Sequence, residues 1–238
     1  ASHQVGGAFI IAAGGFMMLH TDNWSLLFTL PAIFAIFVSI LILIGIKNRP
    51  ESLGLPPVEI YKNDVTNFEE KEYENAHGEE STKDIFVKYI LKNKMVWIVS
   101  IANLFVYIVR IGVLDWAPSF LMEARDFPVD KATYITSAFE LSGIIGALAA
   151  GWLSDKLFKG YRGKVSVIFM VLLVVSVYSV IIIPKGQFWL MLIALFFVGF
   201  FVYGPMLLIA VAAADFATKK AVATAVGLTG LFGYIGAT

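Results

Sequence analysis

The sequence predicts an all-α membrane protein built as a bundle of transmembrane helices. Its 238 residues are 58% hydrophobic and 15% charged, with a mean hydropathy of +0.79. Soluble domains are closer to half apolar and a quarter charged. The charges are also concentrated: residues 47–95 hold 8 of the 18 Lys and Arg and 10 of the 18 Asp and Glu. Long stretches elsewhere are almost free of charge, as expected for a protein that crosses the bilayer several times.

The same composition excludes several other classes of protein. The chain has no Cys, so it is not a disulfide scaffold. Its formal net charge is zero, which excludes nucleic-acid binding through bulk positive charge. Its high apolar content excludes a disordered chain and argues against a soluble enzyme. The sequence also contains none of the His-Glu-x-x-His, Gly-x-Ser-x-Gly or Gly-Lys-Ser/Thr motifs, so we expect no enzyme activity, cofactor or metal site.

Seven apolar stretches follow one another along the chain, and each is predicted to be a membrane-spanning helix. A span needs about 20 mostly apolar residues at about 1.5 Å each. All but the first and last stretches are comfortably long enough. These two run to the chain ends, so we expect the chain to be a fragment of a longer protein. The stretches are residues 1–19, 24–46, 95–121, 132–153, 165–183, 188–214 and 221–238.

The connection at residues 47–94 differs from the others in being long and polar. It begins with turn-forming Pro and Gly residues and is acidic through Phe68–Glu80. We interpret it as a cytoplasmic linker between two helical bundles, with partner binding as the alternative. Its end, Ser81–Lys94, starts with a Ser-x-x-Asp capping signal and is predicted to form a short helix at the membrane surface.

Lys and Arg counts in the connections predict the orientation. The segments 47–95, 154–164 and 215–220 contain eight, four and two of these residues, whereas the alternate connections contain none, two and one. The positive-inside rule places the first group in the cytoplasm. All five Trp residues fall near predicted span ends, as expected for side chains at the membrane interface.

Arg110 is predicted to lie near the bilayer midplane. It precedes Leu121 by eleven residues, or about 16 Å of helix, and half of the hydrocarbon core is about 15 Å. A charge at that depth is costly. The planar guanidinium matches a phosphate or carboxylate in bidentate fashion, although a structural ion pair is the alternative. Asn103 and Tyr107 share its helix face at i, i+4, i+7 spacing, which suggests the wall of a polar cavity.

Three further ionisable residues lie inside predicted spans, and Asp115 is interpreted as a packing or interface partner near the outer end of its span. Glu140 has about the same depth as Arg110, so the two would pair in the ligand-free state or Glu140 would carry a proton. The alternative is a neutral Glu140 bonded to a neighbouring helix. His3 would bind an anion or titrate near neutral pH, or it would make an interhelical hydrogen bond.

The connection after the fourth stretch contains a short motif. It reads Gly-Trp-Leu-Ser-Asp-Lys at residues 151–156 and Lys-Gly-Tyr-Arg-Gly-Lys at residues 159–164. This resembles the G-x-x-x-D-[RK]-x-G-[RK]-[RK] loop of the major facilitator superfamily, with expanded spacing. Asp155, Lys156 and Arg162 are therefore candidates for a conformational latch between helices that separate. The alternative is that these charges have no latch role and only reflect the excess of Lys and Arg in cytoplasmic loops.

Four longer stretches resemble the organophosphate:inorganic phosphate antiporters of that superfamily, the family of the bacterial glycerol-3-phosphate and hexose-6-phosphate transporters. They read ASHQVGGAF, ESLGLPPVEIYKND, NLFVYIVRIGVLDWAPSFL and KKAVATAVGLTGLFGY. The resemblance covers essentially the whole chain and implies helices 5 to 11 of a twelve-helix protein. Residues 1–46 would then be the last two helices of the N-terminal bundle, and residues 95–238 a truncated C-terminal bundle.

The resemblance also implies a binding site and a mechanism. An arginine from each half of the family's proteins binds the substrate phosphate, and the second-half arginine matches Arg110 in YIVRIG. Substrate would draw the halves together, and inorganic phosphate would return through the same site. Asn103 joins the predicted site because it shares the helix face of Arg110. The residues that match the family's site are Arg110, His3, Tyr107, Tyr203, Tyr234 and Glu140.

Substrate choice is less sharply indicated. TGLFGY and the lack of charge in residues 221–238 favour glycerol 3-phosphate, whereas VRIG and VAAADF favour a hexose phosphate. We expect a monomeric multi-pass protein of the bacterial inner membrane whose partners are organic phosphate, inorganic phosphate and the lipid bilayer. The rival interpretation is a sugar-phosphate sensor of the same fold.

Overall fold

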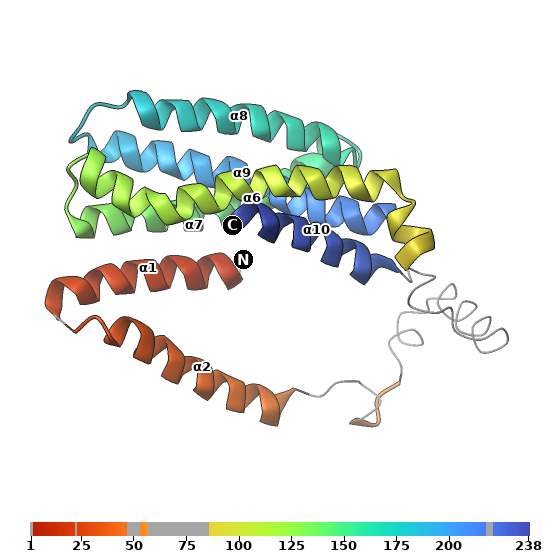
Figure 1. The fold of residues 1–238 in the computed structure, drawn as a ribbon, viewed down its shortest axis with the longest axis horizontal. Helices are drawn as coiled ribbons and strands as arrows, with labels where there is room; N and C mark the ends of the chain where they lie inside the picture. The colour runs from red at the N-terminus through yellow and green to blue at the C-terminus, as the bar shows by residue number, and fades with distance from the viewer. Residues whose placement is uncertain (1, 22, 47–52, 57–85, 218–220) are drawn as a thin grey trace. The chain divides into compact units, whose positions relative to one another are not determined.

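A computed structural model describes residues 2–21, 23–46, 53–56, 86–217 and 221–238, and its regular elements are all helical over these ranges (Figure 1). Three of the elements are single π-helical turns. In chain order the elements are α1 (Ser2–His20), α2 (Leu26–Gly45), η2 (Phe86–Leu91), α6 (Lys94–Ser119), η3 (Phe120–Ala124), α7 (Val129–Trp152), η4 (Leu153–Leu157), α8 (Arg162–Ile182), α9 (Phe188–Phe216) and α10 (Val222–Ala237).

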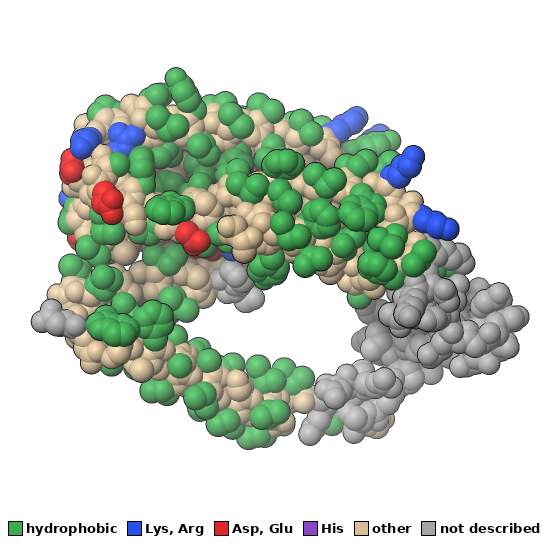
Figure 2. All heavy atoms as spheres, in the orientation of Figure 1, with side chains coloured by type: hydrophobic (Ala, Val, Ile, Leu, Met, Phe, Trp, Pro, Cys, Tyr) green, Lys and Arg blue, Asp and Glu red, His purple; other side chains and the backbone are tan. Residues whose placement is uncertain are grey.

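All seven predicted spans are helical, which confirms the fold class. Five helices are long and apolar enough to cross a membrane, and α1 and α10 are shorter apolar helices. Helices α6 and α7 continue into η3 and η4, so their spans reach 31 and 29 residues. The protein is therefore an integral, multi-pass membrane protein. Figure 2 agrees with this, because hydrophobic side chains are spread along the visible face of the helices and charged side chains are few.

Contacts divide the chain into two units. The first contains residues 1–22 and 83–238, and the second contains residues 23–82. Within the second, α2 is apolar along its length, and none of its residues is buried. In the first, α1 packs on α7, where Gly7 faces Glu140 and Gly15 faces Thr133. The domain division predicted for the longer protein stays a prediction.

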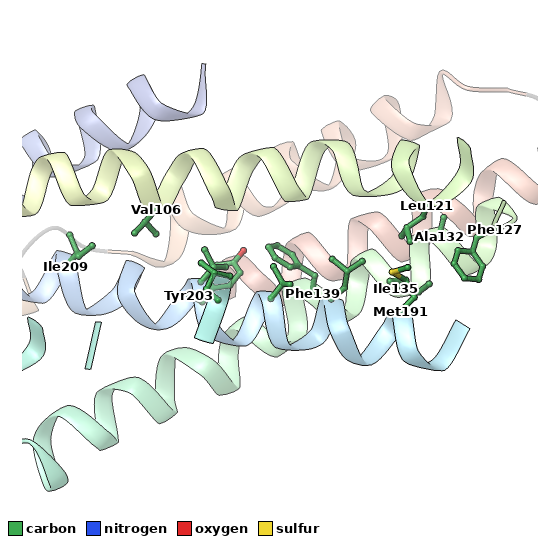
Figure 3. Packing of buried hydrophobic residues seen from close by; sticks show 13 residues of the cluster. Val106, Leu121, Phe127, Ala132, Ile135, Phe139, Met191, Tyr203 and Ile209 are labelled. Carbon is green, nitrogen blue, oxygen red and sulfur yellow. The ribbon is translucent and has the colours of Figure 1, made fainter. Parts of the chain in front are cut away.

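The core of the first unit lies mainly between α7 and α9. Phe139, Val198 and Val202 are almost completely buried in it, and Figure 3 shows Phe139 beside Tyr203. Glycines bring the two helices together, because a Cβ at Gly146 would meet the backbone of Phe200. Close approach of small residues is the usual basis of helix packing in membranes.

The predicted surface helix before α6 is short and partly buried. Within the described residues it consists of the turn η2, while 81–85 lie outside them. Ile90 of this turn is completely buried in a cluster with Val96, Ala221 and Ala225. The end of the linker is therefore packed against the first turns of α6 and α10.

Arg125 joins the end of η3 to the end of α8. Its two terminal nitrogens donate to the backbone carbonyls of Ile183 at 2.7 Å, Val180 at 2.9 Å and Ile181 at 2.7 Å. The last carbonyls of a helix have no partner within that helix and favour a nearby cation. Arg125 therefore acts as a cap for α8.

Candidate functional site

Arg110 lies near the middle of the continuous span Lys94–Ala124, as the sequence predicts. Its side chain is 5% exposed. Nε donates a hydrogen bond to the hydroxyl of Tyr203 at 3.1 Å. Tyr203 comes from the middle of α9, so the bond joins the central parts of two apolar helices.

Glu140 completes a chain of three side chains. The Tyr203 hydroxyl donates to Oε1 of Glu140 at 2.7 Å, and Glu140 is 1% exposed. One possibility from the sequence is a direct ion pair between Arg110 and Glu140, but the structure places the Tyr203 hydroxyl between them. The other carboxylate oxygen, Oε2, has no hydrogen-bond partner among the described residues. It faces Gly7 of α1, where a Cβ would lie 3.3 Å away.

The guanidinium of Arg110 is also bordered by aromatic rings. Its Cζ lies 5.1 Å from the ring centroid of Tyr203 and 5.7 Å from that of Tyr107. These distances are within cation–π range. Tyr107 in turn lies 6.1 Å from the ring of Tyr234 on α10. The structure therefore brings Arg110, Glu140 and all three predicted tyrosines into one connected group.

Among the described residues, nothing accepts a hydrogen bond from the terminal nitrogens of Arg110. Across the same part of the chain Arg110 has no ion pair. An arginine carries five N–H donors and keeps its charge. The site therefore presents a buried cation whose two-pronged end is available for an anion.

Gly143, which the sequence analysis does not assign to the site, fixes the position of Tyr203. A Cβ at Gly143 would overlap the Tyr203 ring, so only glycine fits there. Gly143 lies three residues after Glu140 on α7 and therefore on the same helix face. That spacing is the signal that would have placed it beside the site.

For two predicted residues the described structure shows no contact with Arg110 or leaves the side chain undescribed. Asn103 is buried, and its side-chain amide donates to the backbone carbonyl of Thr229 on α10 at 2.7 Å. His3 belongs to the first turn of α1, but its side chain lies outside the described residues. Their roles in substrate binding stay predictions.

The residues of the predicted latch lie in the turn η4 and at the start of α8. Nε of Arg162 lies 2.5 Å from Oδ2 of Asp215 at the end of α9. Asp155 and Lys156 are exposed in the turn η4 and have no ion pair within the described ranges. Arg162 therefore links α8 to α9, while the latch as a whole stays a prediction. No cluster of three or more metal-ligating side chains occurs in the described residues.

Comparison with known proteins places the whole chain in one family model, described as Major Facilitator Superfamily and matching residues 1–238. A glycerol-3-phosphate transporter of Bacillus subtilis is 41% identical over 99% of this chain and 52% of its own length. The membrane sensor protein UhpC of Salmonella typhimurium is 37% identical over 100% and 53%. A hexose-6-phosphate:phosphate antiporter of Escherichia coli is 36% identical over 98% and 50%. The chain spans about half the length of these curated relatives.

Proposed function

Because the chain belongs to the major facilitator superfamily, we propose that the full-length protein exchanges a small organic phosphate for inorganic phosphate by alternating access. Glycerol 3-phosphate is the first choice of substrate and a hexose 6-phosphate the second. A relative named as a glycerol-3-phosphate transporter and another named as a hexose-6-phosphate:phosphate antiporter support the class of substrate. The partners are then the two phosphates and the lipid bilayer, and the protein is a monomer of the bacterial inner membrane.

The free end of the Arg110 guanidinium carries this proposal. Nε is held by Tyr203, and the planar group therefore has a fixed orientation with its terminal N–H groups unpaired in the described structure. Two parallel N–H···O bonds from such a fork match two oxygens of a phosphate. Phosphate binding would also compensate a charge that is expensive to leave alone at this depth.

The same charge explains why exchange is favoured over one-way transport. An empty site leaves Arg110 with no direct ion pair in the described structure, only a link through Tyr203 to Glu140, and by family resemblance it adds the charge of a second arginine from the first half. A bound phosphate compensates both charges and draws the halves together, which favours the closed intermediate. Either phosphate can do this, so return of the empty carrier is slower than return with inorganic phosphate bound.

Reconstitution of the full-length protein tests the proposal. Liposomes are loaded with inorganic phosphate or left without it, and labelled glycerol 3-phosphate is offered outside with glucose 6-phosphate as competitor. We expect uptake only into phosphate-loaded liposomes, and the competition ranks the two substrates. Uptake that is independent of internal phosphate would contradict exchange. Liposomes without protein provide the baseline.

A sensor is the second candidate, because the 37% identical membrane sensor protein UhpC matches the same stretch of chain. A sensor with this site would bind the organic phosphate without moving it. Folded protein that binds glycerol 3-phosphate or glucose 6-phosphate but takes up neither would favour the sensor over the transporter.

The proposed orientation has its own test. The chain contains no Cys. Once the full-length protein carries no other cysteine, a single introduced cysteine can be labelled selectively. We expect a cysteine at Lys159 to react only after the membrane is made permeable, and one at Lys185 to react in intact cells. The reverse pattern would overturn the orientation.

A further inference from the structure

The contact between α6 and α10 contains one buried polar bond near the functional site. Asn103 is 5% exposed, and its Nδ2 donates to the Thr229 carbonyl at 2.7 Å. The Thr229 hydroxyl is used within α10, where it donates to the Val226 carbonyl at 2.7 Å. In the described parts of α6 and α10, this is the only hydrogen bond that joins the two helices. The bond depends on the Asn103 side chain and on the backbone of Thr229.

Glycines let the two helices approach closely at this point. A Cβ at Gly233 would lie 2.8 Å from Nδ2 of Asn103 and 3.0 Å from Cδ2 of Tyr107. A Cβ at Gly236 would overlap the backbone of Leu104. The amide of Asn103 is therefore enclosed by α10 and faces the helix contact. We therefore expect a change in the hydrogen bonding of Asn103 to shift α10 relative to α6.

A shift of α10 reaches the site through Tyr234. This residue follows Gly233 directly, and its ring is paired with Tyr107 at 6.1 Å. Tyr107 lies one turn beyond Asn103, and its ring borders the Arg110 guanidinium at 5.7 Å. Tyr234 itself is 70% exposed, so nothing but the placement of α10 and the contact with Tyr107 fixes it within the described structure.

We propose that Asn103 is a positioning residue for substrate selection. It fixes the α6–α10 contact and thereby the Tyr107–Tyr234 pair, which contacts the organic part of the substrate while Arg110 holds the phosphate. This role differs from the direct substrate contact that the helix-face pattern predicts for Asn103. The inference rests on the proposed transport function, since it assigns two parts of one substrate to two parts of the site.

Two transport reactions distinguish a positioning role of Asn103 from a merely structural one: exchange of the organic phosphate and phosphate:phosphate self-exchange. In the full-length protein, Asn103→Leu removes the donor at similar size, and Asn103→Asp replaces the donor with an acceptor. We expect the KM for the organic phosphate to rise about tenfold, near the upper end for one interhelical hydrogen bond. Phosphate:phosphate self-exchange, which needs no contact to an organic group, should stay within about twofold of wild type. Thr229→Val is the matched control, because it keeps the carbonyl and should leave both reactions unchanged.

Loss of folded protein would lower both exchanges in proportion and leave the KM unchanged, and that result would overturn the proposal. A measurement independent of transport uses spin labels at the exposed positions Ile108 and Ile235. We expect their distance distribution to broaden in Asn103→Leu but not in Thr229→Val. An unchanged distribution in Asn103→Leu would also overturn the proposal. If the wild-type protein exchanges no phosphate compound, the proposed function fails, and the label distances still decide whether Asn103 positions α10.

Discussion

Arg110 and Arg125 have opposite hydrogen-bonding patterns although they belong to the same stretch of chain. Arg110 lies in the middle of the span Lys94–Ala124, and Arg125 follows its last residue. Arg110 uses Nε, which donates to Tyr203, and its terminal nitrogens have no acceptor in the described residues. Arg125 uses both terminal nitrogens to cap α8, and its Nε is buried without a partner.

The difference separates a binding arginine from a structural one. The guanidinium donates from five N–H groups in a fixed plane. When the terminal groups are satisfied by helix carbonyls, the side chain holds two helices together and has little left for a ligand. When only Nε is satisfied, the side chain is oriented and its end is free. Which nitrogens are used is therefore more informative than the presence of a buried arginine.

The largest effect is expected at Arg110. Arg110→Lys keeps the positive charge but replaces the two-pronged donor with a point donor, and it removes the bond to Tyr203. We expect exchange to fall at least about a hundredfold, because bidentate phosphate binding is lost, while thermal stability in detergent stays close to wild type. Arg125→Lys is the control and should retain most of the exchange. Near-normal exchange by Arg110→Lys would remove Arg110 from the site.

Arg125→Leu should show the reverse pattern. Three carbonyls at the end of α8 lose their donor, which should cost about 2 kcal/mol of stability for this partly exposed group. We expect a lower midpoint of thermal unfolding in detergent and a normal KM for the organic phosphate in the protein that remains folded. A raised KM with unchanged unfolding would show that Arg125 belongs to the binding site instead.

The helices were predictable from the sequence because an apolar run of span length has few alternatives to a helix in lipid. Their ends were less predictable. Helix α8 begins at Arg162 and α7 at Val129, each three residues before the predicted stretch. These added residues are polar or lie at the interface, where hydropathy does not distinguish a helical turn from a loop. The burial of Ile90 in the linker end was missed, because a surface helix and a packed turn have the same amphipathic pattern.

The depth of Arg110 was predictable by counting residues, and its partner was not. Tyr203 lies on another helix, and no local spacing connects the two residues. Family resemblance named Tyr203 for the site, but only the packing of both α6 and α7 on α9 places its hydroxyl between Arg110 and Glu140. The helix-face pattern grouped Asn103 with Arg110, but Asn103 donates to Thr229 on α10 whereas Arg110 donates to Tyr203 on α9. Resemblance to the organophosphate antiporters is confirmed by relatives at 36–41% identity along the whole chain.

An intermediate effect is expected for Tyr203→Phe, which changes how Arg110 is held while keeping its fork. The ring over Arg110 remains, but Nε of Arg110 and Oε1 of Glu140 both lose their partner. An unsatisfied buried group costs about 1–3 kcal/mol, so we expect the KM to rise about tenfold. Tyr178→Phe is the matched control, because Tyr178 is 62% exposed on α8. Equal effects of the two substitutions would mean that the Tyr203 hydroxyl does not orient Arg110.

The smallest effect is expected beside Arg125, where Lys185 and Asp126 form an ion pair at 2.8 Å. Both side chains are more than half exposed, at 60% and 67%. Water and salt screen such a pair, and its usual contribution is about 0–1 kcal/mol. Lys185→Ala should therefore leave exchange unchanged and lower the midpoint of thermal unfolding much less than Arg125→Leu. A loss as large as that of Arg125→Leu would mean that the ion pair, and not the capping of α8 by Arg125, holds this corner of the helical bundle together.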